Sequence, residues 1–143
     1  MSIATVDDLS VGDSYTEEIL FDEQTISRFI EFSRDIASFH TRREFSKQKG
    51  FQGLVVHGFL LSTNFSKILG MELPGENTVI GSVNLEFHEP VYVGDKVKYT
   101  VTVERILTPL GGVLLKLNVQ KADNTPCVQG KATCFFKGNK GKA

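Results

Sequence analysis

Four segments in the C-terminal half of the chain alternate between apolar and polar residues, and no other pattern constrains the fold as much. They span residues 79–87, 97–103, 113–119 and 128–136. Alternation with a period of two is typical of strands with one buried and one exposed face. Turn-forming pairs such as Gly94-Asp95, Gly111-Gly112 and Asp123-Asn124 separate the segments. Four such strands in succession predict an antiparallel meander.

One segment before these strands is apolar over more than half of a helix surface. It begins at the pair His57-Gly58, and Gly70 suits its C-terminal end. Its apolar members are Phe59, Leu60, Leu61, Phe65, Ile68 and Leu69. A helix with so much apolar surface is buried, and the apolar face of the sheet needs a cover. We therefore expect an α+β fold in which a curved antiparallel sheet wraps around a central buried helix.

The residues before this helix predict shorter elements. A short strand is expected within residues 11–19. Asp22 has the chemistry of a helix N-cap, because its carboxylate can accept from free N–H groups of the first turn, and this helix should run to about Arg34. Residues 35–41 predict a loop, and residues 42–49 a helical turn that Gly50 ends. We expect one domain over residues 1–143, with flexible termini at 1–10 and 138–143.

Composition narrows the class of protein. The 143 residues carry 16 basic and 17 acidic side chains, a net charge of −1, whereas a dedicated nucleic-acid-binding domain usually has a basic face. No apolar run approaches the ~18 residues of a membrane span, and the first nine residues lack the features of a signal peptide. Cys127 and Cys134 match no metal-binding spacing and fit a reducing compartment. We expect a cytoplasmic protein with no nucleic-acid, membrane or metal partner.

Asp35 and His40 are the first candidates for chemistry. Both lie in a predicted loop, so their short side chains can converge on one water as a general acid and base, although their spacing alone is unspecific. Gly58 either permits a tight helix entry or offers a free first-turn N–H to a carbonyl oxygen that gains charge. Ser66, a hydroxyl on an apolar helix, by itself predicts only a bond to its own backbone.

Several segments together resemble one enzyme family. The segment from Phe32 to His40 resembles the hydratase motif of MaoC-like dehydratases and (R)-specific enoyl-CoA hydratases. The segment from Val56 to Gly70 is similar to the family's central helix. Leu73-Pro74-Gly75 and residues 87–95 also match, in the family's order and spacing. The resemblance covers nearly the whole chain and implies the hotdog fold, a sheet wrapped around a helix.

The resemblance implies a reversible syn addition of water to a trans-2-enoyl thioester, giving an (R)-3-hydroxyacyl product in fatty-acid metabolism. By position, Asp35 and His40 match the pair that holds and activates the water. The Gly58 N–H matches the donor to the thioester carbonyl, and Ser66 matches a serine that orients the catalytic carboxylate. For His57 the resemblance implies a structural role. The expected substrate is an acyl-CoA or acyl-carrier-protein thioester, and no cofactor is expected.

The resemblance also implies a homodimer, with the acyl tunnel at or beside the subunit interface. A single small sheet leaves an edge strand open, and a second copy would cover it. CoA phosphates would favour a basic rim, and basic residues surround the catalytic loop in sequence. These are Arg34, Arg42, Arg43, Lys47 and Lys49. Each of them could equally be a solvated surface charge.

The chain departs from the family pattern inside the catalytic loop. The family usually has Asp-x-Asn-Pro-x-His, whereas Ala37 and Ser38 stand here in place of Asn and Pro. Because Pro fixes φ, its replacement predicts a looser or differently placed loop, and a displacement near one ångström can cost about a hundredfold in rate. Two alternatives therefore stay open: an acyl-thioester-binding hotdog protein without catalysis, and a hotdog thioesterase.

Overall fold

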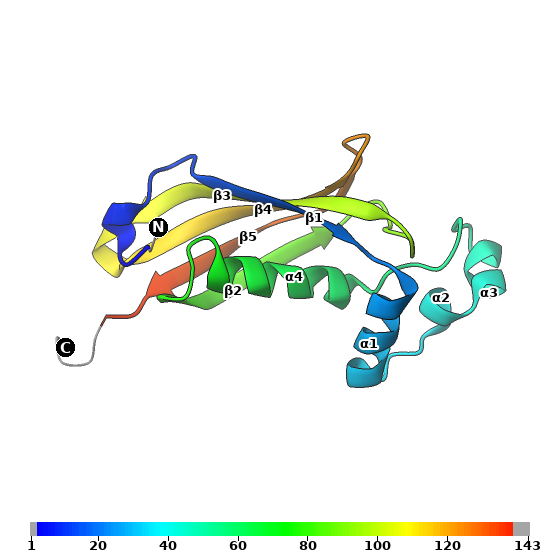
Figure 1. The fold of residues 1–143 in the computed structure, drawn as a ribbon. Coiled ribbons are helices and arrows are strands. Elements are labelled where there is room, and N and C mark those ends of the chain that lie inside the picture. Colours follow the sequence, from blue (N-terminus) through cyan, green and yellow to red (C-terminus); the bar gives the residue numbers. More distant parts are fainter. Residues whose placement is uncertain (1–2, 139–143) are drawn as a thin grey trace.

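The computed structural model describes residues 3–138, which form one five-stranded antiparallel sheet, one long helix and a group of shorter helices (Figure 1). The strands are β1 (Ser14–Leu20), β2 (Thr78–Phe87), β3 (Lys96–Leu107), β4 (Gly112–Lys121) and β5 (Pro126–Phe136). The α-helices are α1 (Glu23–Ser33), α2 (Ser38–Thr41), α3 (Arg43–Gln48) and α4 (Gly58–Met71). Two short 3-10 turns, Val6–Asp8 and Thr108–Leu110, complete the regular structure of the described residues.

The strand order is β1-β3-β4-β5-β2, so three of the four alternating segments form the expected meander. The fourth, β2, pairs with β5 and lies at an edge of the sheet, so the prediction of a four-strand meander is wrong at this strand. Val83 of β2 lies opposite Ala132 of β5. The alternation defines which face of a strand is apolar, but it does not specify the neighbouring strand.

Helix α4 lies along one face of the sheet, which curves around it (Figure 1). Its predicted apolar residues belong to the core except Phe59, which is exposed because the outer side of the helix is open within the single chain. Ile68 and Leu69 are completely buried. The Tyr99 hydroxyl of β3 donates to the Leu61 carbonyl of α4 over 2.7 Å, and the rings of Phe65 and Tyr99 pack edge to face. The helix ends at Met71, one residue beyond the predicted Gly70.

Strand β2 is an exception, because only Leu85 packs against the core and its other large apolar side chains are poorly covered within the single chain. Val79, Ile80, Val83 and Phe87 are 43–52% exposed. The strand register shifts between Ile80 and Ser82, at Gly81. A Cβ on Gly81 would lie 2.5 Å from the Phe135 ring, so a larger residue there would displace that ring. The prediction that one helix covers all four strands therefore fails for β2.

The elements before α4 position the candidate site. Asp22 caps α1 as predicted, since its Oδ1 accepts from the Thr25 N–H at 2.9 Å. Residues 38–41 form the single turn α2, so the prediction of a loop over 35–41 is wrong there. Backbone bonds from His40 to Ala37 and from Arg42 to Ser38, both 2.9 Å, close this turn. Helices α1, α2 and α3 project beyond one end of the sheet (Figure 1).

The ends of the chain bear on the predicted flexible termini. Within the stretch 1–10, Thr5 caps the turn Val6–Asp8, and Leu9 belongs to the buried core. Of the stretch 138–143, only Gly138 is among the described residues. No helix in the described part of the chain is long and apolar enough to cross a membrane.

Candidate active site

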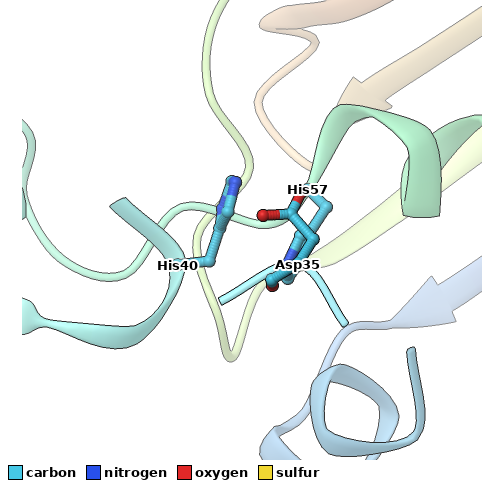
Figure 2. A group of neighbouring side chains, drawn as sticks. All are labelled: Asp35, His40 and His57. Atoms are coloured by element: carbon cyan, nitrogen blue, oxygen red, sulfur yellow. The ribbon is translucent and has the colours of Figure 1, made fainter. Parts of the chain in front are cut away.

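The start of α4 brings together three side chains from separate parts of the chain. Asp35 follows α1, His40 lies on α2, and His57 immediately precedes α4. Each offers one oxygen or nitrogen atom, and these atoms all lie within 4.8 Å of one another (Figure 2). The structure therefore places the predicted pair Asp35 and His40 side by side and adds His57 to it.

His40 is held in one tautomer by a backbone carbonyl. Its Nδ1 lies 2.6 Å from the carbonyl oxygen of Val55, in the segment that leads into α4. A carbonyl oxygen only accepts, so Nδ1 carries the proton and Nε2 of the neutral ring carries a lone pair. His40 is thereby arranged to accept a proton at Nε2.

Asp35 is exposed, and only part of its carboxylate is engaged. Oδ1 accepts from the Ala37 N–H at 3.1 Å, while the Asp35 N–H donates to Ser33 Oγ at 3.1 Å. The preceding residue, Arg34, ends α1 in the left-handed region with φ +61°. The turn at Arg34 and the bond from Ala37 fix the orientation of the Asp35 side chain after α1, and Oδ2 remains available to a ligand.

His57 is buried, with 1% of its surface exposed. Its Nε2 lies 3.0 Å from the Asp35 carbonyl oxygen, so Nε2 is the protonated nitrogen. The other nitrogen, Nδ1, is buried and has no hydrogen-bond partner among the described residues. Burial is the main cause that lowers the pKa of His57 below 6.5, and the neighbouring His40 lowers it further. His57 is therefore neutral near pH 7.

Gly58 is the first residue of α4, where a backbone N–H has no acceptor within the helix. A Cβ at Gly58 would lie 3.2 Å from the ring of Phe87, at the end of β2. Phe87 also lines an apolar groove of about 390 Å³ between α4 and β2. The groove therefore starts beside the predicted carbonyl-binding N–H.

Ser66 lies in this groove rather than at the Asp35–His40 pair. It follows Gly58 by eight residues, roughly 12 Å along a helix that rises about 1.5 Å per residue. Among the described residues, Ser66 makes no hydrogen bond with Asp35. The predicted contact between Ser66 and the catalytic carboxylate is thus not made within one chain, and it stays a prediction for a larger assembly.

Two histidines and an aspartate are a common set of metal ligands, so we tested whether this cluster could hold a metal. The rings of His40 and His57 are stacked, with centroids 3.8 Å apart and planes at 22°. Imidazole lone pairs lie in the ring plane, and those of two nearly parallel rings do not converge on one ion. The stacked arrangement of the two rings therefore does not suit chelation of one ion by both histidines.

The five basic residues predicted to form a rim are all exposed, from the end of α1 to the end of α3. They are Arg34, Arg42, Arg43, Lys47 and Lys49. Helices α2 and α3 thus present several positive charges beside the catalytic loop.

Comparison with known proteins decides the family. A model of the MaoC-like domain matches residues 7–109 of the chain. This chain belongs to the MaoC-like dehydratase family. A mitochondrial 3-hydroxyacyl-[acyl-carrier-protein] dehydratase of Arabidopsis thaliana is 35% identical over 96% of this chain and 74% of its own length. An (R)-specific enoyl-CoA hydratase of Aeromonas caviae is 34% identical over 66% of this chain and 71% of its own length.

Solved structures give the same assignment. The (R)-hydratase of A. caviae, described as involved in PHA biosynthesis, superposes with a TM-score of 0.85 at 28% identity, covering 90% of this chain and 98% of its own. An R-hydratase of Pseudomonas aeruginosa superposes with a TM-score of 0.86 at 24% identity, covering 95% and 87%. The hotdog fold is therefore confirmed, and this MaoC-like protein is a hydro-lyase, a hydratase or dehydratase.

Two features of the MaoC-like site were not predicted from the sequence. The Val55 carbonyl that sets the tautomer of His40 is a backbone group, so no side chain signals its role. The stack of His57 on His40 joins residues 17 positions apart, and only the path of the chain between them creates it. The motif spacing identified both histidines but not their contact.

Proposed function

We propose that this protein is an (R)-specific hydratase of trans-2-enoyl thioesters, or equally the 3-hydroxyacyl-thioester dehydratase of the reverse direction. The observation that carries the proposal is the juxtaposition of the Asp35 carboxylate and a His40 ring with a fixed tautomer. The pair lies at the start of a helix whose first N–H is free. One proton acceptor and one carboxylate beside a carbonyl-binding N–H are the groups that hydration of an enoyl thioester needs.

In the proposed reaction, a water molecule lies between Asp35 and Nε2 of His40. Nε2 takes one proton of the water while the oxygen of the water bonds to C3 of the substrate. The electrons of the double bond move to the thioester oxygen, where the Gly58 N–H stabilises the charge. The proton then returns from the pair to C2. Because one pair supplies both oxygen and proton from one side of the substrate, the addition is syn.

The apolar groove between α4 and β2 suits the acyl chain. Phe59, Phe65, Leu69, Val83 and Phe87 give its walls apolar character. It starts next to Gly58, so a thioester carbonyl at that N–H would direct its alkyl tail along α4. Within one chain the groove is open to solvent, since Phe59 is 83% and Phe87 52% exposed. We propose that a second copy of the chain closes it.

A homodimer through the edge strand β2 would complete both groove and site. The free edge of β2 and its exposed side chains Val79, Ile80 and Val83 offer backbone and apolar groups to an antiparallel copy. A two-fold axis there sets two α4 helices antiparallel, so that Ser66 of one copy lies toward the start of α4 in the other. In this arrangement Ser66 orients Asp35 across the interface.

The direct test is loss of enoyl absorbance with short and medium trans-2-enoyl thioesters of CoA and of acyl-carrier protein, with chiral analysis of the product. We expect turnover of at least one thioester and an (R)-3-hydroxy product. Asp35→Asn and His40→Gln should each lower kcat by about 10²–10⁴-fold with an unchanged circular dichroism spectrum. Wild type that is inactive on both carriers, or variants with full activity, would contradict the proposal.

The same assay separates the alternatives. Release of free thiol would indicate a thioesterase, and binding of acyl-CoA without turnover a non-catalytic binder. The basic rim beside the catalytic loop supports a carrier with phosphate groups, and both CoA and the phosphopantetheine arm of acyl-carrier protein have them. No cofactor takes part in the proposed reaction. A cytoplasmic location remains a prediction, to be tested by localising the tagged protein.

A further inference from the structure

His57 is a polar residue in a place where a helix cap would be expected, yet it does not act as one. It is the N-cap residue of α4, but its side chain makes no capping hydrogen bond. It is 1% exposed, and burial of an imidazole with one unpaired nitrogen is costly. The position therefore needs a reason other than the stability of α4.

The contacts of its ring give that reason. Nε2–H donates to the backbone carbonyl of Asp35 over 3.0 Å. One face of the ring stacks on His40 at 3.8 Å, with the planes 22° apart. Phe29 of α1 packs edge-on against it, with centroids 4.9 Å apart. A single buried ring thus touches both members of the proposed acid–base pair (Figure 2).

We propose that His57 is a positioning residue, which sets the separation and orientation of Asp35 and His40. This inference rests on the proposed hydratase function. Without His57, His40 keeps one ring bond, to Val55, which fixes its tautomer but leaves its tilt free. Asp35 is exposed, and its segment would lose the tie from its carbonyl to the buried helix start.

The neutral state of His57 is part of this role. Its Nδ1 has no acceptor nearby in the described structure, so a proton there would be buried without a partner. A positive charge on His57 would also lie directly against the ring that receives a proton in the reaction. Burial accordingly favours the uncharged ring.

Two substitutions separate the two contacts. His57→Phe keeps a flat ring against His40 but removes the donor to the Asp35 carbonyl, whereas His57→Asn keeps an N–H donor but removes the flat face. We expect each to lower kcat about 10-fold or more per folded molecule, with KM of the thioester changed less than about twofold. His88→Asn, which removes an exposed histidine, is the matched control and should keep wild-type kinetics.

A second readout distinguishes positioning from support of the fold. In ¹⁵N spectra of the imidazole groups, wild type should show His40 protonated at Nδ1 and His57 protonated at Nε2. His57→Asn should leave the proton of His40 on Nδ1, because the Val55 carbonyl still accepts it, but should shift and broaden the ring signals of His40 as the ring loses its stacked face. If the variants change only the melting temperature, with wild-type kcat and an unchanged His40 spectrum, the inference is wrong.

The spectra also keep the inference apart from the proposed function. An inactive wild type would overturn the hydratase assignment, while the His40 spectrum of the variants would still report whether His57 holds that ring. If both variants fail to fold, the ¹⁵N spectrum of wild-type His57 tests the inference by itself. A His57 ring that is charged at pH 7, or whose Nε2–H exchanges rapidly with solvent, would refute the inference.

Discussion

The ring of His40 lies face to face with the ring of His57, with centroids 3.8 Å apart. One histidine is half-buried and presents a free Nε2, and the other is buried and held neutral. The two also donate to different carbonyls, those of Val55 and Asp35. The proposed acid–base pair of this MaoC-like protein therefore packs against a second, uncharged imidazole.

This relationship predicts how stability depends on pH. The pKa of His57 is lowered in the folded chain, chiefly by burial, so below about pH 6.5 the unfolded chain binds a proton that the folded chain does not. This component of stability is complete above about pH 6.5 and is lost as pH falls towards the lowered folded pKa. Urea melts at a series of pH values give the free energy of unfolding at each pH. Below pH 6.5 this free energy should fall less steeply with decreasing pH for His57→Phe than for wild type. An equal dependence of the unfolding free energy on pH in variant and wild type would show that His57 does not contribute to it.

The free N–H at Gly58 predicts the effect of a proline there. Gly58 is the first residue of α4, and His57 before it has φ −56° and ψ 134°, a conformation that tolerates a following proline. Gly58→Pro removes the N–H while α4 is kept, and kcat should fall about 10²–10³-fold. Gly58→Ala keeps the N–H and needs only a small shift of the Phe87 ring, so it is the steric control. Equal losses in both variants would point to crowding instead.

The missing proline of the catalytic loop predicts a stabilising substitution. Ser38 is the first residue of α2, and Ala37 before it has φ −51° and ψ 143°, which suits a residue before proline. In the absence of that proline, Thr41 helps to hold the loop. The Thr41 hydroxyl donates to the carbonyls of Ile36 and Ala37 at 3.0 and 3.2 Å. Ser38→Pro should raise the unfolding free energy by about 0.4–1 kcal/mol without loss of kcat. A destabilised Ser38→Pro protein would show that Ser38 needs its backbone freedom.

The position of Ser66 predicts complementation between subunits. Asp35→Asn removes the carboxylate, and Ser66→Ala removes the hydroxyl without filling the groove. If each site combines Asp35 of one copy with Ser66 of the other, a mixed dimer of the two variants contains one intact site. Refolding the two impaired proteins together should then give more activity than either variant has alone, measured as loss of enoyl absorbance. No recovery in mixed dimers, with their formation verified by mass spectrometry, would show that Ser66 does not act on Asp35 across the interface.

The sequence by itself determined the local features of this protein. Period-two alternation identified the strands, the Asp22 carboxylate marked the start of α1, and the apolar surface of residues 59–69 identified the buried helix. The loop motif identified Asp35 and His40, and the helix start identified Gly58. All of these depend on residues a few positions apart, and such local patterns can be recognised from the sequence alone.

Only the tertiary structure decided the long-range relationships. It placed β2 at the sheet edge beside β5, left the apolar side chains of Val79 and Val83 uncovered, and separated Ser66 from Asp35. It also stacked His57 on His40 and gave His40 the Val55 carbonyl. The physical reason is that pairing of strands, packing of rings and bonds to backbone carbonyls depend on the path of the whole chain. A carbonyl has the same chemistry at every residue, so the sequence cannot mark which one will accept the hydrogen bond from His40.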